Sequence, residues 1–177
     1  MDKQAFNYND GGRAAAGYRG NTGDCVVRAI AIATGKPYKE VYNALWAGGI
    51  FFKETSRTSV AKRMSDKTTS PRNGVNRRVY HPYLLSLGMV WTPTMFIGQG
   101  CRVHLQADEL PGGILIVRVS KHLTTMVDGV INDTFNPQRG GSFYAILNGV
   151  KTRGTTPQRC VYGYYSFPKT TNTNNRE

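Results

Sequence analysis

Cysteine is scarce in this sequence, and the spacing of the three cysteines does not predict a disulfide pair. Cys25, Cys101 and Cys160 are an odd number of residues at wide separation, which does not predict a disulfide framework. In a reducing compartment all three would stay thiols, available for packing or for catalysis. Long apolar runs are missing too, since no stretch approaches the roughly 20 apolar residues of a membrane-spanning helix. We therefore expect no membrane-spanning segment.

A secretion signal is also missing at the start of the sequence. Residues 1–7 lack the basic start and apolar centre of such a signal, so we expect an intracellular, cytoplasmic protein. The 177 residues, 40% hydrophobic and 11% aromatic, are typical of one globular domain with a hydrophobic core. We expect this domain to span residues 1–168, with a flexible lead-in over 1–17 and a disordered tail over 169–177.

Acidic residues are few. They number 11 against 23 basic residues, for a formal net charge of +12. Residues 53–78 alone contain eight basic and two acidic residues, half of the excess. Such a field attracts nucleic acid, anionic membrane or an acidic protein, and we keep nucleic acid and acidic protein as candidate partners. A solvated surface explains the segment equally well, because charge alone carries no specificity.

The apolar pattern predicts helices first and an antiparallel sheet afterwards, which is an α+β fold. A buried helix is expected over 24–34, capped by Asp24 and ended by Gly35. A second helix should begin at Pro37 and stop at Gly48-Gly49. Residues 53–78 fit a short helix or a loop. The remaining expected elements are a short helix over 83–87 and strands over 89–91, 102–105, 114–119 and 161–167.

Cys25 stands where a thiol can be activated. A polar, glycine-rich loop, residues 20–24, leads into the apolar run 26–33. A helix N-terminus carries partial positive charge, which lowers the pKa of a nearby thiol and favours the nucleophilic thiolate. A buried cysteine on an apolar helix is also common packing. The position of Cys25 alone therefore does not predict a nucleophile, and other residues have to support that interpretation.

That support comes from a predicted β-hairpin late in the chain. Two strand-like runs, 122–127 and 130–135, flank Asp128-Gly129, one of the strongest hairpin signals. The offsets put His122 and Asp133 on neighbouring strands, within about two residues of register. An imidazole would accept the thiol proton and later donate it to a leaving group. A carboxylate would hold that imidazole in the productive tautomer.

Asn21 and Asp24, which both precede Cys25 in the sequence, bear on this chemistry. The Asn21 side-chain amide is placed to donate to a developing oxyanion, together with the Cys25 backbone N–H. Asp24 acts against the scheme, because an ionised neighbour raises the pKa of a thiol unless its side chain turns away to cap the helix.

A structural zinc site is a competing interpretation. Cys101 and His104 form a Cys-x2-His pair, with His81 and Cys160 as candidate partners. No second closely spaced pair completes the set. We therefore expect neither a metal nor another cofactor, and we interpret His81 and His104 as packing or hydrogen-bonded residues.

Residues 21–25 leading into a buried helix, together with the hairpin 122–133, resemble the papain-like cysteine peptidase fold, above all its compact bacterial and phage branches. The stretches 122–133 and 159–164 also resemble small, uncharacterised proteins of tailed phages. The resemblance implies Cys25 as nucleophile, His122 as general base and Asp133 as orienting residue. Papain-like enzymes usually carry a glutamine before the cysteine, whereas the nearest amide here is Asn21.

Two hypotheses of function follow. The first is a cysteine hydrolase, phage-encoded and located in the host cytoplasm, that cleaves an amide or isopeptide bond of a protein or peptide through a thioester at Cys25. Acyl transfer to an amine would use the same three residues. The second is a basic protein that binds nucleic acid or a host protein on a papain-like scaffold with a vestigial triad. Papain-like folds host both kinds, so the fold does not choose between them.

Overall fold

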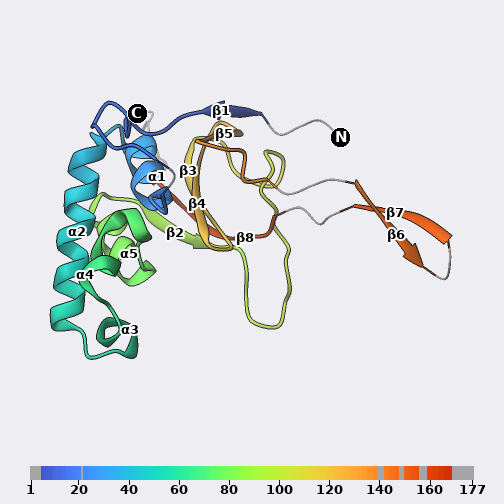
Figure 1. The fold of residues 1–177 in the computed structure, drawn as a ribbon. Coiled ribbons are helices and arrows are strands. Elements are labelled where there is room, and N and C mark those ends of the chain that lie inside the picture. The colour runs from blue at the N-terminus through green and yellow to red at the C-terminus, as the bar shows by residue number, and fades with distance from the viewer. Residues whose placement is uncertain (1–4, 21, 139–141, 148–149, 156–158, 169–177) are drawn as a thin grey trace, which may run out of the picture.

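The computed structural model describes residues 5–20, 22–138, 142–147, 150–155 and 159–168. The fold is α+β, with the helices ahead of most strands along the chain (Figure 1). The helices are α1 (Cys25–Thr34), α2 (Tyr38–Thr55), α3 (Ser59–Lys62), α4 (Asp66–Thr69), the 3-10 helix η1 (Pro71–Asn73) and α5 (Arg77–Ser86). The strands are β1 (Phe6–Tyr8), β2 (Val90–Pro93), β3 (Ile114–Val119), β4 (His122–Val127), β5 (Val130–Asp133), β6 (Ser142–Leu147), β7 (Val150–Thr155) and β8 (Val161–Ser166).

The main sheet is mixed rather than purely antiparallel. Its strands follow the order β1-β5-β4-β3-β8-β2, and β1 pairs with β5 in parallel whereas the other neighbours are antiparallel. β1 lies inside the stretch 1–17 that we expected to be a flexible lead-in. A segment of three residues is too short for an alternation of polar and apolar side chains to predict a strand. β1 is defined instead by its main-chain pairing with residues 131–133. β6 and β7 form a separate hairpin. The expected tail lies outside the described residues.

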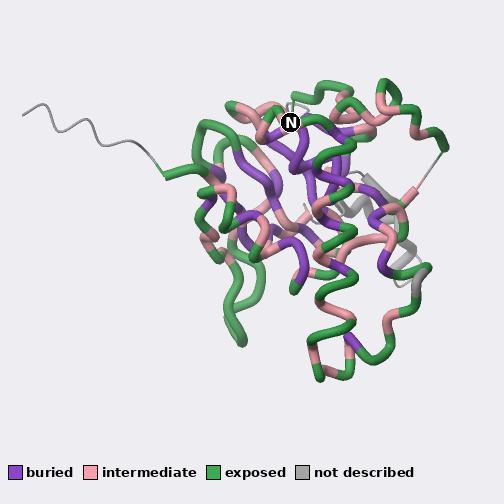
Figure 2. The backbone as a smooth tube through the Cα atoms, turned by 90° about the vertical axis from the view of Figure 1, so that its left-hand side faces the viewer, coloured by how far each residue is buried: buried purple, intermediate pink, exposed green. Residues whose placement is uncertain are grey.

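Helix α1 begins and ends close to the predicted positions. It runs from Cys25 to Thr34, and Gly35 follows in the left-handed conformation with φ 69°. Seven of its ten residues are buried. The apolar ones join residues of α2 and α5 in a core against Ile116, Leu123 and Tyr165 of the sheet. Figure 2 shows the buried residues gathered in the centre of the molecule.

A second apolar cluster lies on the opposite face of the sheet. It contains the β3 residues on either side of Ile116, namely Leu115 and Val117, as the alternation of a strand requires. Leu105 and Leu110, from the long segment between β2 and β3, complete it. The sheet therefore has helices over one face and this segment over the other.

Two helix boundaries differ from the prediction. Helix α2 continues through Gly48 and Gly49 to Thr55. A Cβ at Gly49 would lie 3.3 Å from the Thr69 carbonyl oxygen, so this glycine permits the close approach of α4 instead of ending a helix. Helix α5 starts at Arg77, six residues before the predicted start, because Asn76 caps it by accepting a 2.9 Å hydrogen bond from the Arg78 N–H.

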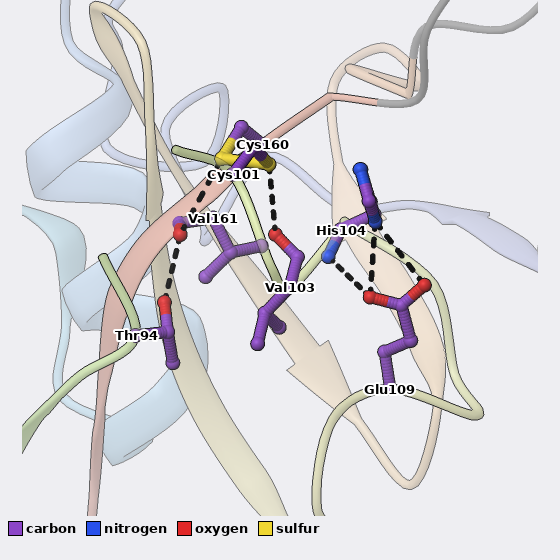
Figure 3. Close-up of a disulfide and its surroundings, with 7 residues drawn as sticks. All are labelled: Thr94, Cys101, Val103, His104, Glu109, Cys160 and Val161. Atoms are coloured by element: carbon purple, nitrogen blue, oxygen red, sulfur yellow. Dashed lines mark hydrogen bonds and ion pairs between the residues drawn. A yellow bond between two sulfur atoms is a disulfide. The ribbon is translucent and has the colours of Figure 1, made fainter. Parts of the chain in front are cut away.

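Cys101 and Cys160 form a disulfide, which corrects the expectation of three free thiols (Figure 3). The fold brings their Cα atoms to 5.8 Å although they are 59 positions apart in the sequence. The predicted strand 102–105 is reduced to a bridge between His104 and Cys160. No helix among the described residues is long and apolar enough to span a membrane.

Candidate active site

The loop before Cys25 is fixed against η1 and the residue that follows it. The Gly23 N–H donates a 2.8 Å hydrogen bond to the Arg72 carbonyl. A Cβ on Gly23 would lie 3.2 Å from the Gly74 nitrogen, so glycine allows this close approach. Cys25, a free thiol, is the first residue of α1. It lines a pocket of about 600 Å³ together with residues 73–77 and His122.

The β4–β5 hairpin brings His122 and Asp133 together. Met126 pairs with Ile131, so continuing this register makes His122 and Asp133 diagonal neighbours on one face. The His122 Nε2 and the Asp133 Oδ2 are 2.7 Å apart, and both side chains are more than 90% buried. The predicted proximity of these two residues is therefore present in the structure.

His122 also lies near enough to Cys25 that the imidazole and the thiol shift each other's pKa. Because Asp133 occupies Nε2, Nδ1 is the ring nitrogen left for the sulfur. Burial raises the pKa of Cys25, but the effect of His122 outweighs it, and the net pKa lies below the ordinary value. Burial lowers the pKa of His122, yet Asp133 and Cys25 raise it to about 9. These opposite shifts favour a thiolate–imidazolium pair.

Asp133 is itself held by several donors. Its Oδ1 accepts hydrogen bonds from the Thr134 N–H at 2.7 Å and from the Arg28 Nη2 at 3.2 Å. Burial raises the pKa of Asp133, but these donors and His122 reverse the effect, so the pKa is lowered. The carboxylate therefore stays ionised beside the imidazole.

Arg28 is a site residue that the sequence analysis did not single out. It is 4% exposed and lies one helical turn after Cys25. Its Nη1 pairs with Asp24 and its Nη2 with Asp133, and its charge contributes to the lowered pKa of Cys25. A single arginine inside the apolar run 26–33 was the available signal, because a buried cation needs an anionic partner.

Asp24 lies at the N-cap position, but its side chain does not cap the helix. It is fully buried and instead accepts hydrogen bonds from Arg28 and, at 2.7 Å, from the Tyr38 hydroxyl. The expected capping role is therefore wrong. Asp24 is turned toward Arg28, whose cation balances its charge beside the thiol.

Asn21, the predicted oxyanion donor, lies outside the described residues. The Cys25 backbone N–H is available in principle, since the first N–H groups of an α-helix have no intrahelical acceptor. This N–H is suited to donate to the oxyanion that develops on a carbonyl group attacked by the Cys25 sulfur. The Asn21 role stays a prediction.

The disulfide contradicts the zinc interpretation, because neither bonded sulfur is available as a thiolate ligand. The His104 Nδ1 is 3.1 Å from the Glu109 Oε2 (Figure 3). His81 Nδ1 is 2.8 Å from the Tyr165 hydroxyl. Within the described part of the chain, no group of three or more His, Cys, Asp or Glu residues is arranged to hold a metal ion.

The basic segment 53–78 divides into two parts. Five of its basic side chains are exposed, namely Arg57, Lys62, Arg63, Lys67 and Arg78. Lys53, Arg72 and Arg77 are half-buried. Arg72 lies over the ring of Tyr18, and Arg77 lines the pocket beside Cys25. The end of the segment is thus a wall of the candidate site.

Comparison with known proteins adds no relative. No protein-family model matches the chain, and no match was found among curated proteins or solved structures.

Proposed function

We propose that this protein is a cysteine hydrolase that cleaves an amide or isopeptide bond through a thioester on Cys25. The observation that supports it best is His122, which is 2.7 Å from Asp133, lines the same pocket as Cys25 and lowers the pKa of that thiol. We further propose a papain-like fold, because the thiol starts a helix packed on a sheet whose neighbouring strands carry the histidine and the aspartate.

In the first half of the reaction, the Cys25 thiolate attacks the carbonyl carbon and forms a C–S bond. The carbonyl π electrons move to oxygen, where the Cys25 N–H at the start of α1 stabilises the anion. When this intermediate collapses, the C–N bond breaks. The proton on His122 Nδ1 goes to the leaving amine, and a thioester remains.

In the second half, His122 is neutral and accepts a proton from water, which attacks the thioester. The C–S bond breaks, the acid product leaves and the thiolate–imidazolium pair returns. Asp133 holds the ring orientation through both halves and stabilises the imidazolium. Acyl transfer differs in one step, because an amine replaces water as the acceptor.

The test is hydrolysis of a denatured protein mixture by the wild type and by Cys25→Ala, with new chain ends identified by mass spectrometry. We expect new ends with the wild type and none with the variant. Adding a primary amine at millimolar concentration separates hydrolysis from acyl transfer, because transfer gives products whose mass is increased by the amine. Equal products from the wild type and Cys25→Ala would contradict the proposal.

The alternative is a basic binding protein with a vestigial triad. It rests on the five exposed basic side chains of residues 53–78. It predicts salt-dependent binding of random DNA or RNA that is equal in the wild type and in Cys25→Ala, with no cleavage by either. This result, together with an ordinary thiol at Cys25, would favour the binding function.

A further inference from the structure

The pocket beside Cys25 is strongly basic. Besides Arg28, its walls contain Arg77 of α5, Arg118 of β3 and Lys121 of the turn between β3 and β4. Among the described residues that line it there is no aspartate or glutamate. Three separate elements thus direct positive charge to one cavity, next to the sulfur and the imidazole.

Arg28 has carboxylate partners, whereas the other three cations have none among the residues that the structure describes. Arg28 pairs with Asp24 and Asp133. The salt bridges found over the described ranges include none that involves Arg77, Arg118 or Lys121. A cavity with unbalanced cations and low-dielectric walls concentrates anions.

Aromatic rings hold two of these guanidinium groups in place. Arg77 lies over the ring of Trp91 at 4.7 Å, and Arg118 over the ring of Tyr162 at 5.3 Å. The Nε of Arg77 is buried and has no hydrogen-bond partner in the described structure. A stacked guanidinium is pre-organised, so it loses little side-chain freedom when it binds a carboxylate.

We propose that the substrate of this site carries a carboxylate close to the bond that is cleaved, and that Arg77 and Arg118 bind it. This inference rests on the proposed function, because the pocket is assigned to a substrate of Cys25. A carboxylate matches the planar fork of an arginine with two parallel N–H···O bonds. Acidic peptides are therefore the substrate class that the pocket favours.

The first experiment compares two alkylating reagents of similar size, iodoacetate and iodoacetamide. They differ in carrying a carboxylate or a neutral amide, and intact mass measures the rate of each at Cys25. The quantity compared is the rate with iodoacetate divided by the rate with iodoacetamide. A change in the reactivity of the thiolate alters both rates equally, so it cancels in this ratio. We expect the ratio, relative to that of N-acetylcysteinamide, to be at least about tenfold higher at low salt.

The deciding comparison is between variants of equal charge loss. The double variant Arg77→Gln, Arg118→Gln should lower the ratio several-fold. The control is the double variant Arg63→Gln, Arg78→Gln, since both residues are exposed and neither lines the pocket, and it should keep the wild-type ratio. Equal ratios in the pocket variant and the control variant would overturn the carboxylate assignment, even if Cys25 behaves as a thiolate toward iodoacetamide. An ordinary thiol at Cys25 would instead overturn the proposed function, and this inference with it.

A second arm separates the two sources of a peptide carboxylate, which are an acidic side chain and a chain terminus. Short acetylated peptides compete with iodoacetamide for the pocket, and the competitors are a Glu peptide amide, its Gln counterpart and a Gln peptide with a free C-terminus. Protection by the first points to an acidic side chain, and protection by the third to a chain terminus. Equal behaviour of all three would overturn the proposal.

Discussion

The three cysteines belong to two regions that use sulfur differently. Cys25 has an imidazole partner, and the net effect of its neighbours is a lowered pKa. Cys101 and Cys160 are bonded to each other and connect the segment between β2 and β3 to the start of β8. A thiolate needs neighbouring positive charge, whereas a disulfide needs two sulfur atoms brought together by the fold. The neighbours of each cysteine therefore decide its chemistry, not its spacing in the sequence.

The two regions are also held together by different forces. Around Cys25, a buried ion-pair network joins Asp24, Arg28 and Asp133 across α1 and β5. Around the disulfide, backbone hydrogen bonds join Val103 to Val161 and Leu105 to Arg159, each at 2.8 Å. Mutations should therefore affect stability and thiol chemistry together in the first region and stability alone in the second.

The largest effect on stability should come from the ion-pair network. Arg28→Met leaves the buried Asp24 and Asp133 without their shared cation, and removing one partner of a buried pair costs about 3–5 kcal/mol. Urea unfolding followed by circular dichroism measures this change. Arg78→Met is the matched control on an exposed site, with an expected change within about 0.5 kcal/mol. Similar values for the two variants would show that the network does not stabilise the fold.

Removing the disulfide should have the next largest effect. The double variant Cys101→Ser, Cys160→Ser should lower the free energy of unfolding by about 2–4 kcal/mol, because the unfolded chain regains the freedom of a long loop. The same urea titration detects it. Alkylation of Cys25 by iodoacetamide under folding conditions should keep its wild-type rate. A tenfold change in that rate would contradict the separation of the two regions.

The smallest effect should come from Gly163 of β8, the strand that begins directly after Cys160. Its φ is 149°, and a Cβ would clash with the Trp91 ring and lie 2.6 Å from the Thr92 carbonyl oxygen. Gly163→Ala should therefore lower the free energy of unfolding by about 1–3 kcal/mol, as overpacking does. The matched control is Gly112→Ala, since the nearest atom to a Cβ there is 3.8 Å away. If both variants unfold alike, the close approach of Trp91 is not a constraint.

Local patterns predicted much of the fold and of the site. The apolar run after Asp24 and the Asp128-Gly129 turn are short-range signals, so α1 and the β4–β5 hairpin were expected near their observed positions. The turn also sets the register, which is why His122 and Asp133 could be paired from the sequence. Their catalytic role stays a prediction.

Long-range contacts were missed because no local pattern encodes them. β1 is defined by its pairing with β5, more than 120 residues later in the chain. The disulfide depends on residues 59 positions apart. Arg77 and Arg118 reach the pocket from different elements, and no local pattern in the sequence brings them together.

The most direct test of the central claim is the pH dependence of iodoacetamide alkylation at Cys25 in the wild type and in His122→Gln. The thiolate–imidazolium pair exists between the lowered pKa of Cys25 and the pKa of His122, about 9. The wild-type rate should therefore fall less steeply between pH 8 and pH 6 than the rate of an ordinary thiol. In His122→Gln, the rate should fall roughly fifty- to a hundredfold, as for a thiol of pKa about 8.5. The same steep fall in both proteins would contradict the claim that His122 activates Cys25.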